Sequence, residues 1–87
     1  MNFTTAMRSL LDHRDSVLPC LVNAYKANGD IICHWNLTSG DSLRLQIERI
    51  VVEAKMILPD YFEHSVQTEF IPRSVRLPSV LNITFDV

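Results

Sequence analysis

Apolar residues near the start of the chain recur with the spacing of one helix face. They stand at i, i+3, i+4, i+7 and i+8, which are Phe3, Ala6, Met7, Leu10 and Leu11. This spacing predicts an amphipathic helix over residues 3–14. Asn2 or Thr4 can cap its first turn, and the polar run 12–16 ends it.

A hairpin is predicted next, because two apolar runs, 20–27 and 30–37, flank Asn28-Gly29. Asn-Gly is typical of a two-residue type I′ turn, and such a turn fixes the strand register. One face of this hairpin is almost wholly apolar and is predicted to be the core: Cys20, Val22, Ala24, Ile31, Cys33, Trp35 and Leu37. The other face is mixed and is predicted to point outward: Leu21, Asn23, Tyr25, Ile32, His34 and Asn36.

A second helix of roughly 17 residues is predicted to end at about residue 57. The polar stretch 38–42 offers its N-cap, and Pro59 ends it. Most of its apolar residues keep helical spacing: Leu43, Ile47, Ile50, Val51, Ala54, Ile57 and Leu58. Leu45, Val52 and Met56 lie off this stripe, so the apolar surface of the helix is wider than one sheet needs.

The last third of the chain alternates apolar and polar residues, which predicts strands at 66–71 and 81–87. A loop rich in proline and arginine joins them. The order α-β-β-α-β-β predicts one α+β domain over residues 1–87. We expect a two-layer sandwich, with a four-stranded antiparallel sheet and two helices on one face. One arrangement is a circular permutation of the ferredoxin-like βαββαβ pattern, with strand order 3-4-2-1 and strand 20–27 at an edge.

Composition and charge exclude several classes of protein. The 87 residues are 47% apolar and 21% charged, which excludes a disordered segment. Eight Lys and Arg residues against ten Asp and Glu residues give a net charge of −2, which argues against nucleic-acid binding through bulk charge. No apolar run is long enough for a membrane helix. The chain starts without a basic and then apolar leader, so we expect a cytoplasmic protein.

The sequence offers no complete set of catalytic or metal-binding residues. The His and Cys residues lack the spacings of metal sites, and the adjacent Cys33 and His34 point to opposite faces of a strand. Cys20 and Cys33 are predicted to be free, core-facing thiols, because they are too far apart to form a disulfide in this register. Two glycines cannot form a phosphate-binding loop. We therefore expect a protein that is not an enzyme and has no cofactor or metal.

A protein-binding surface is the leading functional hypothesis. His34 opposite Asn23, with Tyr25 nearby, is the most site-like cluster, although a carboxylate and a nucleophile are missing. The predicted partner-binding residues are Tyr25, Ile32, His34, Arg73 and Arg76. The partner is another protein, as for an inhibitor, antitoxin or mobile-element regulator, or a second copy bound through the open sheet face or the edge strand 20–27. The alternative is a homodimeric domain that senses a small molecule.

Overall fold

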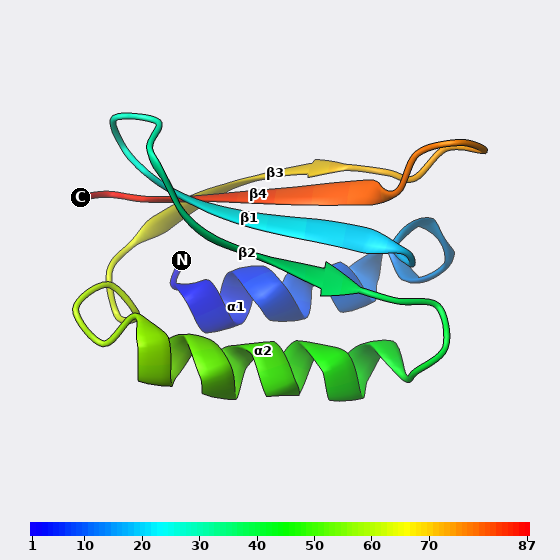
Figure 1. Cartoon of the computed structure of the whole chain (residues 1–87), viewed down its shortest axis with the longest axis horizontal. Coiled ribbons are helices and arrows are strands. Elements are labelled where there is room, and N and C mark those ends of the chain that lie inside the picture. The colour runs from blue at the N-terminus through cyan, green and yellow to red at the C-terminus, as the bar shows by residue number, and fades with distance from the viewer.

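A computed structural model describes all residues, 1–87, as one layer of helices beneath one sheet (Figure 1). The elements in chain order are α1 (Phe3–Arg8), two 3₁₀ turns (Ser9–Asp12 and Arg14–Ser16), β1 (Cys20–Lys26), β2 (Ile31–Leu37), α2 (Leu43–Ile57), β3 (Val66–Ile71) and β4 (Ser79–Phe85). The predicted α-β-β-α-β-β order and the placement of both helices on one face are confirmed. The other face of the sheet is open.

The first helix is shorter than predicted. Asn2 caps α1 by accepting a hydrogen bond from the backbone N–H of Thr5 at 3.0 Å. The α-helix ends at Arg8 and continues as a 3₁₀ turn, where the Ser9 hydroxyl donates to the carbonyl of Ala6 at 2.6 Å. Serine hydroxyls that bond back to the preceding turn compete with regular helix, which accounts for the change of helix type. Four of the five predicted apolar residues are still fully buried, and Leu11 is half-buried against the core.

The β1–β2 register is as predicted from Cys20 to Ala24, but the turn differs. The N–H of Gly29 donates to the carbonyl of Lys26, and Gly29 has φ 92°. These features make a three-residue loop whose glycine occupies the left-handed region, in place of the two-residue turn. A bulge then pairs Tyr25 with Ile31. As a result Ile31 points to the open face and Ile32 packs against the core. The predictions that Ile31 faces the core and that Ile32 faces outward were therefore both wrong.

The sheet is mixed, with strand order β2-β1-β4-β3, so the antiparallel order 3-4-2-1 was wrong. β1 and β4 run parallel at the centre, and the two hairpins extend outward from them. Strand 20–27 is therefore not an edge; β2 and β3 are the edges. Burial explains this order, because β1 and β4 are buried or half-buried on both faces, whereas β2 and β3 carry exposed polar residues.

An aromatic cluster around Phe3 joins the two layers. The Phe3 ring lies 5.5 Å from that of Trp35, 5.9 Å from Phe62 and 6.1 Å from Phe85. Phe3 is fully buried and Trp35 is only 8% exposed, which confirms Trp35 as a core residue. The cluster holds α1 against β2, β4 and the segment after α2.

A buried glutamine fixes the start of α2. The side chain of Gln46 accepts from the N–H of Thr38 at 2.9 Å and donates to the carbonyls of Thr38 and Asp41 at 2.8 and 3.2 Å. Ser42 caps the helix by accepting from the N–H of Leu45. These bonds set the direction in which α2 leaves β2, so they also set which side of α2 faces the sheet.

Candidate functional site

One polar row crosses the open face of the sheet, with one residue from each strand. The strand pairings align His34 on β2 with Asn23 on β1, Asn82 on β4 and Glu69 on β3. Asn23 donates an amide hydrogen bond to Asn82 at 3.1 Å, and Asn82 donates to the Glu69 carboxylate at 3.1 Å. The amides of the two central strands are thus held in place by each other and by Glu69.

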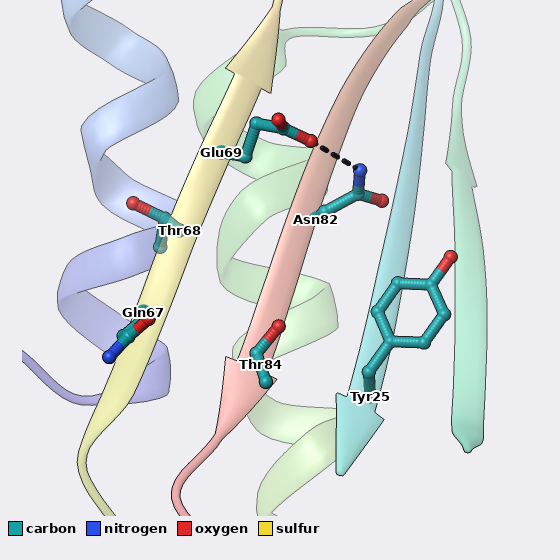
Figure 2. Close-up of a pocket in the computed structure, with 6 residues that line it drawn as sticks. All are labelled: Tyr25, Gln67, Thr68, Glu69, Asn82 and Thr84. Atoms are coloured by element: carbon teal, nitrogen blue, oxygen red, sulfur yellow. Dashed lines mark hydrogen bonds between the residues drawn. The ribbon is translucent and has the colours of Figure 1, made fainter. Parts of the chain in front are cut away.

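A shallow hollow of about 300 Å³ lies beside this row. Figure 2 shows the side chains that line it, which are Tyr25, Gln67, Thr68, Glu69, Asn82 and Thr84. Five of the six are polar, so the hollow presents hydrogen-bond donors and acceptors and one carboxylate. Such a lining can orient a small polar molecule. Its lining includes no histidine and no thiol.

The structure brings only part of the predicted site together. Asn23 lies opposite His34 as predicted, but its amide donates to Asn82. Tyr25 lies in the next row, opposite Ile31 and beside Thr84. The predicted cluster is therefore part of a hydrogen-bonded sheet surface, and His34 is an exposed residue on the edge strand β2.

The two predicted arginines lie at the other end of the sheet. Tyr25 pairs with Thr84, whereas the loop that holds Arg73 and Arg76 leaves the sheet beyond Val80, about 13 Å farther along β4. Arg73 donates from its backbone N–H to the carbonyl of Ser16 and from Nε to that of Asp15 at 2.9 Å. It anchors the loop, while Arg76 is exposed. The five predicted residues do not form one surface.

Both cysteines are free, and burial makes them poor nucleophiles. Desolvation raises the pKa of the Cys20 thiol, and desolvation together with the nearby Glu53 raises the pKa of Cys33 to about 11. At neutral pH both groups stay protonated, and the thiol form is unreactive. No group of three or more His, Cys, Asp or Glu side chains is arranged to hold a metal ion.

The largest apolar groove lies on α2, on the side away from the sheet. Leu45, Val52 and Met56 are 47%, 61% and 73% exposed, and together with Glu48, Arg49 and Glu53 they line a groove of about 400 Å³. The opposite side of the helix carries its buried residues, which are Gln46, Ile47, Ile50 and Ala54. Figure 1 shows α2 as an outer element, with the sheet on one side only. We name Leu45, Val52 and Met56 the α2 outer row.

Sequence reasoning found these three residues but placed the associative surface on the sheet. Their signal was an apolar stripe wider than one sheet requires. The open sheet face contains a polar row, whereas the α2 outer row is apolar and exposed.

No helix has both the length and the apolar character to cross a membrane. Comparisons with protein-family models, with curated proteins and with solved structures found no match for this chain.

Proposed function

We propose that this chain is a protein-interaction module that binds its partner through the outer side of α2. The α2 outer row is the observation that carries the proposal. Three large apolar side chains stand exposed along one line of a helix whose other side is fully used by the core. Contiguous exposed apolar surface on a small domain is typical of an interface, and an apolar helix face is a common recognition element.

The charged residues beside the row support a protein partner over a membrane surface. Glu48 and Glu53 flank the row, and Arg49 interrupts it. Amphipathic helices that bind membranes are rich in Lys and Arg on the polar side of the helix. The mixture of both signs at the rim of an apolar strip is typical of protein–protein interfaces, where a polar rim surrounds an apolar centre.

Photo-crosslinking in the cell that makes the protein tests this proposal. A benzoylphenylalanine residue replaces Met56 in one variant and Gln67, on the open sheet face, in a matched control variant. We expect one defined adduct from position 56, lost when Val52→Glu is added, and none from position 67. An adduct from position 67 alone would place binding on the sheet face, and no adduct from either position would refute the proposal.

A second candidate function rests on the hollow beside the polar row. Its volume of about 300 Å³ and its five polar side chains suit a small polar ligand, as in a ligand-sensing domain. A thermal-shift screen of metabolites tests this, because a ligand at one hundred times its Kd stabilises the native state by about 2.7 kcal/mol. The shift should disappear in Glu69→Gln, which removes the only carboxylate, and persist in Val52→Glu. A screen in which no metabolite shifts the melting temperature would contradict this second candidate function.

A further inference from the structure

We infer that the partner on the α2 outer row is a second copy of this chain, bound with the two α2 helices antiparallel. This inference rests on the proposed function, since it names the occupant of the same surface. It follows from the positions of the charged residues around the row, which complement each other in one orientation only.

The exposed side of α2 has the spacing of a helix–helix seam. Leu45, Arg49, Val52 and Met56 follow one another at intervals of four, three and four residues, which is the a/d spacing of a coiled coil. The buried residues Ile47, Ile50 and Ala54 lie on the opposite side, so the seam points away from the core. The helix α2 has 15 residues and is about 22 Å long, and the seam from Leu45 to Met56 spans about 17 Å of it. A second helix of equal length can lie along it.

A parallel pairing of two α2 helices brings like charges together. Arg49 stands in the seam, so two parallel copies place Arg49 beside Arg49. In parallel pairs the flanking contacts join residues five apart, and here these are Glu48 and Glu53, which are both negative. These charged contacts along a parallel seam are therefore all repulsive, which disfavours this orientation for an isolated pair of copies.

An antiparallel pairing turns the same residues into attractive contacts. Leu45 then packs against Met56 of the second copy, and Val52 packs against the methylene groups of Arg49. On one flank the Arg49 head group lies beside the second copy's Glu53, and on the other flank Glu48 lies beside Lys55. A two-fold axis repeats each contact, which gives four attractive pairs. Glu48 keeps its bond to Arg8, which is 2.7 Å long.

Sedimentation equilibrium with matched variants tests the inference. The seam is smaller than a standard interface, so we expect a weak and reversible dimer of the 10.0 kDa chain. Val52→Glu should raise the dimer dissociation constant at least tenfold. The control is Ile71→Glu, which changes an exposed apolar residue on the open sheet face and should leave the constant unchanged. Circular dichroism confirms that each variant is folded.

Charge reversal distinguishes the antiparallel seam from other self-contacts. Arg49→Glu and Glu53→Arg should each weaken the homodimer about tenfold, because two contacts change from attraction to repulsion. Mixing the two variants should restore dimers, since each copy then meets opposite charges, and so should the double variant R49E/E53R. Dimers that Val52→Glu weakens but that mixing does not restore would overturn the antiparallel arrangement.

The remaining outcomes separate this inference from the proposed function. A protein that stays monomeric at millimolar concentration, or that loses its dimer in Ile71→Glu but not in Val52→Glu, refutes the second copy as occupant. If position 56 still crosslinks to a different protein, the interaction module stands and only the identity of the partner was wrong. A monomer that also gives no adduct refutes both.

Discussion

Replacement of Trp35 by alanine tests whether the aromatic cluster holds the two layers together. Trp35 lies on the edge strand β2, faces Val22 across the hairpin and packs its ring 5.5 Å from that of Phe3. Its side chain is only 8% exposed. Truncation therefore removes an apolar contact between the sheet and α1, and it leaves a cavity beside Phe3.

The expected loss of stability is about 3 kcal/mol. Burying an aromatic side chain removes about 150–250 Å² from water, which is worth at most about 4–6 kcal/mol at about 25 cal/mol per Å². Measured Trp→Ala losses in cores are about 3–5 kcal/mol. The low end applies here, because Trp35 also borders a surface groove with Asn36 and Arg49, so water and neighbouring side chains can fill part of the space.

Urea unfolding followed by far-ultraviolet circular dichroism measures this loss. Trp35 is the only tryptophan, so fluorescence cannot report on the variant. A domain of 87 residues has about 4–13 kcal/mol of stability in total, and a loss of 3 kcal/mol lowers Tm by about 12–24 °C. Trp35→Phe, which keeps a ring beside Phe3, should lose clearly less, and the exposed neighbour His34→Ala should change stability by less than about 0.5 kcal/mol. A Trp35→Ala loss below about 1 kcal/mol would refute the packing described here.

Three further predictions concern buried or half-buried groups. Gln46→Ala should lower the free energy of unfolding by about 2 kcal/mol, because three hydrogen bonds to the segment before α2 are lost, and an unchanged urea midpoint would contradict this. Asn82→Ala should cost about 1 kcal/mol, more than the exposed Asn36→Ala, because it removes the bonds to Asn23 and Glu69; equal losses would show that the polar row contributes no stability. Stability should fall as pH rises from 9 to 11, because the unfolded Cys33 thiol ionises near its ordinary pKa of 9.0 while the folded one stays protonated up to about 11. Urea titrations at both pH values measure this fall, and it should be smaller in Cys33→Ser; an equal fall in that variant would assign the effect to other groups.

Local sequence signals predicted the first half of the fold well. The Asn28-Gly29 pair and the alternation around it gave the strand partners from Cys20 to Ala24 and the burial of Trp35. The signal could not separate a two-residue loop from a three-residue loop followed by a bulge, since both return the strands to the same register. Because of that one extra loop residue, Ile31 lies on the open face and Ile32 on the core face, the opposite of the prediction.

The way in which the two hairpins join could not be predicted. The pairing of β1 with β4 links residues far apart in the chain, and no local pattern states which strands become neighbours. The candidate site depends on this pairing, because Asn23 meets Asn82 and Glu69 only when β1 and β4 are adjacent. The α2 outer row was visible as surplus apolar residues, but its exposure depends on how the chain turns around Gln46.

The parallel centre of the sheet has a consequence for the speed and order of folding. Each hairpin and each helix closes over a short stretch of chain, and such elements form within microseconds. The β1–β4 ladder instead joins Cys20 to Ser79. Closing so long a loop loses conformational entropy before the stabilising contacts between the two strands have formed. We expect docking of the two hairpins to limit the folding rate. Asn82→Ala should then slow folding, whereas substitutions on the outer edge of β3 should mainly speed unfolding. Stopped-flow kinetics across a urea series measures both rates, and the opposite pattern would contradict this order of folding.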